Sequence, residues 1–242
     1  MLSTLILVHG GALSSRMFTT LTPELENRGY TKIITPDLPG HGTNQGLGSF
    51  SFAKSTELIH KTIQDLRSSD SATRILLVGI SLGGQAVLDL LAHHPADVDL
   101  AIVSGASIAP PSDDAPWEMP RMPEGEEGKF WMDLIMKDVE IVGMDEAQKI
   151  QQASFAFKFE PDTAAAKDVF PPVMVLIGEK DVAMARRDQT AVLEIVKRLN
   201  GRSEGIIFKD AWHNHSMDRP ERFADLIAEW DRKMNGNASS NK

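Results

Sequence analysis

Six short apolar runs, separated by stretches of helical pattern, constrain the fold of this chain more than any other feature. Within them Ile, Val and Leu follow one another without alternating with polar residues, which is typical of strands buried on both faces of a parallel sheet. The runs cover residues 4–8, 32–35, 74–79, 100–105, 173–178 and 205–208. Apolar residues at helical spacing predict helices over 17–28, 52–67, 82–94, 186–199 and 220–234. This alternation predicts a doubly wound, mainly parallel α/β sheet of about six strands.

One long segment between the fourth and fifth runs does not fit the alternation. Residues 107–128 are rich in Pro, Ser, Asp, Glu and Gly, and residues 129–159 show two helical patterns broken near Gly143. A closed eight-stranded barrel is the rival topology, and its two further strand–helix units would have to lie in this segment. Because no clear strand pattern occurs there, we interpret the segment as a helical insertion.

The charge and the cysteine count exclude several classes of function. The chain has 242 residues, no cysteine and a formal net charge of −9 at pH 7. The lack of cysteine excludes a disulfide framework, a thiolate nucleophile, Cys-ligated zinc and an iron–sulfur cluster. A general nucleic-acid binder carries the opposite charge, and the longest unbroken apolar stretches are about half as long as a membrane span. We therefore expect a cytoplasmic, soluble protein that binds neither nucleic acid nor membrane.

A Gly-Ile-Ser-Leu-Gly-Gly string at residues 79–84 directly follows the third run and directly precedes a predicted helix. It fits the pattern G-x-S-x-G, which on its own is a weak signal, because Ser81 could simply cap a glycine-rich helix start. A strand that turns sharply into a helix, however, needs small flanking residues and presents the central hydroxyl at the carboxyl edge of the sheet. The context therefore favours Ser81 as a nucleophile.

A serine hydroxyl becomes a good nucleophile when a histidine takes its proton and an acid orients that histidine. The loop between the last predicted strand and helix offers His213 and His215. The other histidines lie in helical patterns or turns, namely His9, His41, His60, His93 and His94. Asp181 is the best-placed acid, because it follows a buried strand at the edge where ligands gather in parallel sheets; its alternative role is to cap the next helix. Rival acids are Glu179, Asp188 and Asp210.

The chain order Ser81, Asp181, His213 resembles the triad order of the α/β-hydrolase superfamily. The motifs that carry the resemblance are HGG at 9–11, DLPGHG at 37–42, GISLGG at 79–84, GEKD at 178–181 and WHNHSMDRPERF at 212–223. The resemblance extends from residue 4 to about residue 232 and implies the α/β-hydrolase fold. It also favours His213 over His215, because members often carry a proline seven residues after the catalytic histidine, as Pro220 does here.

The resemblance further implies an oxyanion hole and a cap. The oxyanion donors would be the N–H groups of Leu82 and Gly11, with Ala12 as the alternative to Gly11, although HGG could also be only a tight turn. Relatives carry a helical cap at the position of the insertion. The implied division is a core of residues 1–106 and 166–242 and a cap of residues 107–165.

The cap composition suggests a mostly apolar pocket. The expected substrate-contacting residues are Ile80, Ala12, Trp117, Phe130, Trp131 and His215, although each aromatic residue of the cap could instead pack it onto the core. The glycine-rich stretch 40–46 misses the dinucleotide-binding spacing, and no Walker-type lysine is present, so we expect no nucleotide cofactor. We expect no metal either, because His213 and His215 with no third partner in sequence make a weak metal signal.

Three functions stay open. The first is a serine hydrolase that cleaves a carboxylic ester, thioester or lactone of a small, mainly apolar substrate through an acyl-enzyme on Ser81. The second keeps the triad but hydrolyses a carbon–carbon bond or acts like a hydroxynitrile lyase. The third is a ligand-binding or sensing protein with little turnover. A monomer is the default expectation, and a homodimer is the alternative.

Overall fold

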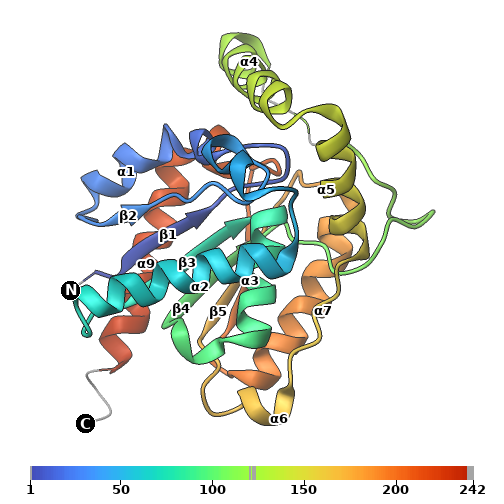
Figure 1. The fold of residues 1–242 in the computed structure, drawn as a ribbon. Coiled ribbons are helices and arrows are strands. Elements are labelled where there is room, and N and C mark those ends of the chain that lie inside the picture. The colour runs from blue at the N-terminus through green and yellow to red at the C-terminus, as the bar shows by residue number, and fades with distance from the viewer. Residues whose placement is uncertain (1, 120, 122–123, 239–242) are drawn as a thin grey trace.

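The computed structural model describes residues 2–119, 121 and 124–238 and centres on one six-stranded sheet (Figure 1). The strands are β1 Thr4–Val8, β2 Ile33–Ile34, β3 Ile75–Ile80, β4 Leu100–Ser104, β5 Val173–Gly178 and β6 Glu204–Phe208. Their order is β2-β1-β3-β4-β5-β6, and each neighbouring pair is parallel. Each predicted apolar run matches one of these strands to within one residue at either end, so the predicted doubly wound α/β fold is confirmed.

Alternate side chains of the central strands enter two separate cores, one on each face of the sheet. In β1, Leu5 and Leu7 join the cluster on one face, and Ile6 and Val8 join the cluster on the other. All four are fully buried, which stabilises the fold by about 1.5–3 kcal/mol for each side chain. The edge strand β6 differs, because Ile207 is 63% exposed there.

The helices form one layer on each face of the sheet (Figure 1). They are α1 Leu21–Asn27, α2 Phe52–Ser69, α3 Leu82–His93, α7 Ala183–Leu199 and α9 Pro220–Ala238. Side chains of α2, α3 and α7 join the core that contains Ile6, and side chains of α1 and α9 join the core that contains Leu5. Shorter helical segments are η1 Ser15–Phe18, η2 Gly42–Leu47, η3 Pro95–Asp97 and α8 His215–Asp218.

The helix expected over residues 17–28 is divided into η1 and α1. Ser14 caps η1, because its Oγ accepts a hydrogen bond from the Arg16 N–H. Pro23 then lies in the first turn of α1, where its missing N–H leaves no helical hydrogen bond unmade. Among the described residues, none of the helices combines the length and apolar character that a membrane crossing requires.

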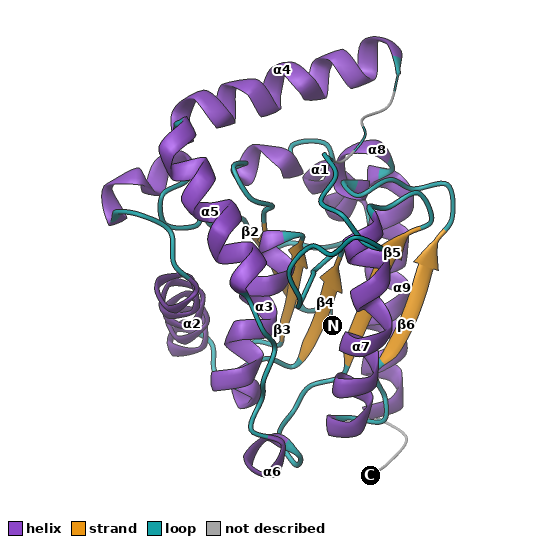
Figure 2. Cartoon of the chain, turned by 90° about the vertical axis from the view of Figure 1, so that its right-hand side faces the viewer, coloured by secondary structure: helices purple, strands orange, loops and turns teal. Residues whose placement is uncertain are grey.

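The insertion between β4 and β5 is helical, as expected. It contains α4 Gly125–Val142, α5 Met144–Ala156 and the short α6 Thr163–Ala166. The break falls at Gly143, whose φ of +79° suits glycine. Figure 2 shows α4 lying across the end of the molecule toward which the strand arrows point. Helix α4 therefore lies beyond the carboxyl edge of the sheet, whereas α6 lies at the opposite end of the molecule (Figure 2). The division of the insertion from the core at residues 107 and 165 stays a prediction.

Candidate active site

Ser81 is the single residue between the end of β3 and the start of α3. Its φ of 57° and ψ of −119° are unusual for a residue with a side chain, and such backbone strain typically costs about 1–3 kcal/mol. The Ser81 N–H donates to the carbonyl of Ser104, at the end of β4, over 2.8 Å. The turn is thus tied to the neighbouring strand, which helps to maintain the strained conformation.

The glycines of the G-x-S-x-G pattern are required by packing. A Cβ placed on Gly79 would lie 2.3 Å from the Gly83 carbonyl oxygen. A Cβ placed on Gly83 would lie 2.1 Å from the Val8 carbonyl oxygen. Since real Cβ atoms do not approach backbone oxygens so closely, the first turn of α3 can pack against β1 and β3 only with these glycines.

Asp181 and His213 form a direct pair in the turns that follow β5 and β6. His213 Nδ1 lies 2.5 Å from Asp181 Oδ1, and both residues are buried. The same carboxylate accepts hydrogen bonds from the N–H groups of Val182, at 2.7 Å, and Gly178, at 3.4 Å. Val182 occupies the N-cap position of α7, so Asp181 orients the histidine and does not cap the helix.

Contact between the two residues shifts the pKa of each. Burial acts to lower the pKa of His213, but the charge and hydrogen bond of Asp181 outweigh it and raise that pKa. Burial acts to raise the pKa of Asp181, and the nearby His213 and His215 outweigh it and lower that pKa. Asp181 is therefore ionised at neutral pH. With Nδ1 held by the carboxylate, Nε2 is the ring atom left for proton transfer.

Gly105 connects the serine turn to the Asp–His pair. Its neighbour Ser104 accepts the Ser81 N–H. A Cβ on Gly105 would lie 2.8 Å from His213 Cε1 and 3.4 Å from Asp181 Oδ2, and its φ is +60°. The structure thus gathers the three predicted residues at one edge of β3, β4 and β5. Sequence reasoning did not single out Gly105, although the Ser-Gly end of the fourth apolar run was its signal.

The loop after β1 brings Gly11 against the start of α3. A Cβ on Gly11 would lie 3.6 Å from Leu82 Cβ and 3.3 Å from Ile150 Cγ2 of α5. The Leu82 N–H belongs to the first turn of α3, where backbone donors lack partners within the helix. The Ala12 N–H already donates to His41 Nε2 over 3.2 Å. Gly11 is therefore favoured over Ala12 as an oxyanion donor.

Three of the expected substrate-contacting residues lie in the interior. Ile80 and Trp131 are part of the core, with at most 1% of their surface exposed. His215 is fully buried, with Nε2 bonded to Ser104 Oγ and Nδ1 2.8 Å from the Trp212 carbonyl oxygen. These side chains have no surface to offer a ligand, because they serve packing or hydrogen bonding within the protein.

The other three expected contacts are accessible. Trp117 and Phe130, on the insertion, are 47% and 51% exposed, and Ala12 is half-buried. Substrate contact stays a prediction for these residues.

One group of potential metal ligands lies away from Ser81. His60 of α2, His94 at the end of α3 and Asp97 of η3 have ligand atoms within 4.8 Å of one another. His60 Nδ1 is 2.9 Å from Asp97 Oδ2, and the two imidazoles stack with ring centroids 4.0 Å apart. These contacts account for the cluster as a polar contact and a ring stack between helices. It lies at the opposite end of α3 from Ser81, so it takes no part in the candidate site.

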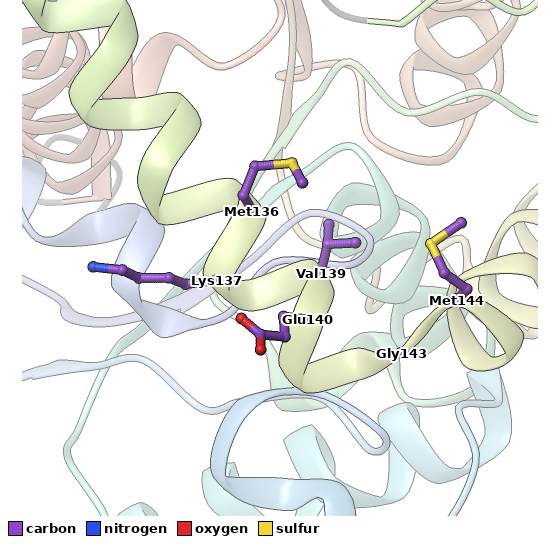
Figure 3. A pocket seen from close by; sticks show the side chains of 6 residues that line it. All are labelled: Met136, Lys137, Val139, Glu140, Gly143 and Met144. Atoms are coloured by element: carbon purple, nitrogen blue, oxygen red, sulfur yellow. The ribbon is translucent and has the colours of Figure 1, made fainter.

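A shallow hollow of about 450 Å³ lies on the insertion at the junction of α4 and α5 (Figure 3). Its lining residues are Met136, Lys137, Val139, Glu140, Gly143 and Met144. None of them belongs to the group around Ser81, so the hollow is separate from the candidate site.

Comparisons with known proteins agree with the fold. The model of the alpha/beta hydrolase family matches residues 5–226. A pyrethroid hydrolase from Sphingobium wenxiniae is 25% identical over 250 residues, which cover 93% of this chain and 86% of that protein. The solved structure of a thermophilic esterase from Thermogutta terrifontis superposes with a TM-score of 0.67 at 23% identity, over 96% of this chain and 90% of that one.

A shorter match relates the chain to another named esterase. A pimeloyl-acyl-carrier-protein methyl ester esterase from Aromatoleum aromaticum is 32% identical over 117 residues, 47% of this chain and 42% of that protein. The match therefore spans less than half of that relative's length. The family model, in contrast, spans nearly the whole sheet and its helices. The chain belongs to the alpha/beta hydrolase family.

Proposed function

We propose that the protein is a serine hydrolase that cleaves carboxylic ester bonds of small, mainly apolar substrates. The observation that carries the proposal is the 2.5 Å contact between His213 Nδ1 and Asp181 Oδ1, at the sheet edge where Ser81 stands in its strained turn. The relatives named as esterases support ester hydrolysis as the reaction. Thioesters and lactones would react through the same steps, because their carbonyl carbon is attacked in the same way.

The proposed reaction gives each of these groups a role. Asp181 holds the Nδ1–H of His213, so that Nε2 takes the proton of Ser81 Oγ as it attacks the ester carbonyl. The N–H groups of Gly11 and Leu82 stabilise the negative oxygen of the tetrahedral intermediate. His213 then gives the proton to the departing alkoxide, leaving an acyl-enzyme on Ser81. Water, activated by His213, repeats the cycle and releases the acid. These steps need neither a cofactor nor a metal.

The insertion is assigned the role of cap. Ile150 of α5 approaches Gly11, and Ser154 of α5 donates from Oγ to Gln85 Oε1 of α3 over 2.8 Å. Helix α5 thus covers the loop that carries one oxyanion donor. An apolar side chain beside that donor favours substrates whose acyl or alcohol group is apolar, because such a group would be buried against Ile150.

The test is labelling with a fluorophosphonate, read by intact mass, on the wild type and on Ser81→Ala. Ser68→Ala, on α2, is the matched control. We expect one adduct on the wild type and the control, and none on Ser81→Ala. A panel of p-nitrophenyl esters of increasing acyl length should then show turnover that depends on Ser81.

Two outcomes would replace the proposal. A folded wild type that takes no adduct and turns over no ester, but binds small apolar ligands, would identify a sensing protein. Turnover of a carbon–carbon substrate without ester cleavage would identify the second reaction class that the triad can serve.

A further inference from the structure

Two fully buried histidines lie beneath the loop that carries Gly11. His9 follows β1, and His41 lies in the DLPGHG segment, with the ring centroids 5.0 Å apart. Neither belongs to the proposed triad. Burying an imidazole is unfavourable unless its polar atoms find partners. The partners of the four ring nitrogens therefore indicate what these side chains hold in place.

His9 fixes the peptide group on the amino-terminal side of Gly11. Its Nε2 accepts the Leu38 N–H at 2.9 Å, so in the neutral ring the proton is on Nδ1. That Nδ1–H donates to the Gly10 carbonyl at 2.8 Å, and the Leu13 N–H approaches the same oxygen at 3.4 Å. The Gly10 C=O and the Gly11 N–H belong to one planar trans peptide group and point in opposite directions. Holding the carbonyl therefore directs the Gly11 N–H.

His41 fixes the peptide group on the other side of Gly11. Its Nε2 accepts the Ala12 N–H at 3.2 Å, and its Nδ1 donates to the Pro39 carbonyl at 3.0 Å. Ala12 has a φ of +55°, in the left-handed region that a residue with a Cβ seldom adopts. The hydrogen bond to His41 thus stabilises a backbone conformation of Ala12 that is unfavourable in the absence of such a contact.

Both histidines reach the same short segment. His9 bonds to Leu38 and His41 to Pro39, and the preceding Asp37 accepts the Ser15 N–H at 2.7 Å. Three hydrogen bonds therefore join residues 37–41 to the chain around Gly11: His9 to Leu38, Ala12 to His41, and Ser15 to Asp37. These bonds give a structural role to the DLPGHG motif, which contains none of the proposed triad residues.

We propose that His9 and His41 are positioning residues that hold the peptide groups on both sides of Gly11, so that its N–H points at the oxyanion, and that they do so only as neutral Nδ1–H imidazoles. The inference rests on the proposed function, because it gives the Gly11 N–H its role. Protonation of either Nε2 would place an N–H against the N–H of Ala12 or Leu38. Acid should therefore release the loop.

The surroundings favour the neutral rings. Burial lowers the pKa of His41, and burial together with the nearby His41 lowers the pKa of His9 to about 3. Three carboxylates that face His41 act in the opposite direction without reversing the shift, namely Asp37, Asp138 of α4 and Glu146 of α5. The aromatic ring of Phe50 packs edge-on against His41 and adds no charge.

The first test reads the tautomers without any substrate. Two-bond ¹H–¹⁵N spectra at pH 7, assigned with His9→Gln and His41→Gln, should show both rings neutral with the proton on Nδ1. An Nε2–H tautomer or an imidazolium at either position would overturn the inference. This test does not measure turnover, so it is independent of the proposed function. If the protein shows the expected tautomers but no esterase activity, the role of His9 and His41 in holding the Gly11 loop stands and the proposed function fails.

The second test compares His41→Gln with His41→Ala on an ester substrate. The Gln amide oxygen can accept the Ala12 N–H in place of Nε2 and does not titrate, whereas Ala leaves that N–H without a partner. We expect His41→Ala to lower kcat by about 10²–10³-fold with little change in KM, as for loss of an oxyanion donor. His41→Gln should retain kcat within about 10-fold and tolerate acid better than the wild type. His93→Ala, exposed on α3, is the control.

The comparison separates positioning from packing. Equal losses in the two His41 variants, in both kcat and KM, would mean that the ring only fills space, and the inference would fail. An unchanged kcat in a folded His41→Ala would also overturn it. If His41→Ala does not fold, kcat and the acid profile are measured on His41→Gln alone. A His41→Gln variant that unfolds at the wild-type midpoint but has no measurable activity would contradict the proposed acceptor role of the residue at position 41.

Discussion

The sheet edge that carries Ser81 and the α4–α5 insertion beyond it use glycine for different reasons. At the edge, a Cβ on Gly83 would lie 2.1 Å from the Val8 carbonyl oxygen, so no side chain fits there. In the insertion, Gly143 has a φ of +79°, and among the described residues other than its two chain neighbours no atom lies within 4 Å of the place of its Cβ. The edge is fixed by close packing on several sides, whereas the break between α4 and α5 is fixed by the backbone of one turn.

The insertion is joined to the core by polar contacts as well as by apolar ones. Asp138 of α4 accepts from Ser14 Oγ, and Glu146 of α5 accepts the Phe50 N–H at 2.6 Å. On its outer surface, α4 leaves Phe130 and Met136 more than half exposed. The difference suits the two tasks proposed above. The packed edge would hold the proposed reacting groups in fixed geometry, and the insertion could vary with the substrate with little effect on that geometry.

The largest effect should come from the packed edge. In Asp181→Asn, the amide keeps the shape of the side chain but no longer stabilises the His213 tautomer that leaves Nε2 free. A neutral amide in this position lowers kcat by about 10⁴-fold in the serine-protease example from which the rule is known, and we expect a loss of that order here. Steady-state rates on a p-nitrophenyl ester measure it. Glu179→Gln, two residues away, should stay within about 2-fold, because this exposed carboxylate bonds to the Asp210 N–H and not to the Asp181–His213 pair. A loss below about 10-fold in Asp181→Asn would remove Asp181 from the triad.

The two glycines give the next effect and test the comparison itself. Gly83→Ala should lower the free energy of unfolding by about 3 kcal/mol or more, because overpacking against the β1 backbone cannot relax through a side chain. Gly143→Ala should cost less, about 1–3 kcal/mol, because its φ of +79° and ψ of +150° lie in a backbone region that only glycine adopts readily. Urea denaturation of both variants measures the difference. Equal costs would show that the edge and the insertion do not differ as described.

Acid should destabilise the edge through its buried histidines. Burial lowers the pKa of His9, His41 and His215 below the ordinary value of 6.5, so the unfolded chain binds protons first as the pH falls. Each such histidine lowers the free energy of unfolding by about 1.4 kcal/mol per pH unit below about 6.5, down to its folded pKa, which for His9 is about 3. The raised pKa of His213 acts the other way: its contribution is complete below about 6.5 and is lost as the pH rises through the folded value.

Urea denaturation between pH 7 and pH 5 checks this slope. His41→Gln should reduce the slope by about 1.4 kcal/mol per pH unit, the contribution of one proton. The Ser68→Ala control, which removes no titratable group, should leave the slope unchanged. A wild type as stable at pH 5 as at pH 7 would mean that the buried rings accept protons without opening the structure.

Much of the fold and the centre of the site could be predicted from the sequence, because both rest on local signals. Continuous Ile, Val and Leu indicated each strand, and the break at Gly143 followed from a glycine between two helical patterns. The serine turn was predictable because the same six residues supply the strand end, the small flanking positions and the helix start.

The rest depends on partners that are distant in the chain. Phe130 and Trp131 are adjacent and chemically alike, yet one is 51% exposed and the other 1%, which only the rotation of α4 against the core decides. His41 appeared to be a turn residue, and its role depends on Ala12, 29 residues earlier. His215 was expected at a pocket wall, but its partner Ser104 lies 111 residues away on β4.

The smallest effect should come from the contacts of α4, and it tests whether the insertion is joined as described. Asp138 is 1% exposed and accepts hydrogen bonds from Ser14 Oγ at 2.9 Å and Arg16 Nε at 3.0 Å. Asp138→Asn removes the charge and turns part of the acceptor into a donor. We expect a loss of about 1–3 kcal/mol in the free energy of unfolding, discounted toward the lower end because Arg16 is 41% exposed. For esters, KM should rise more than kcat falls.

Met136→Ser, on the exposed side of the same helix, is the matched control and should change stability by less than about 0.5 kcal/mol. If the serine variant costs as much as Asp138→Asn, the outer side of α4 is packed against something in solution, and a concentration-dependent unfolding midpoint would identify a second copy of the chain as the partner. If neither variant changes stability or KM, α4 is held by Trp131 and its apolar neighbours alone, and the polar contacts do not join the insertion to the core.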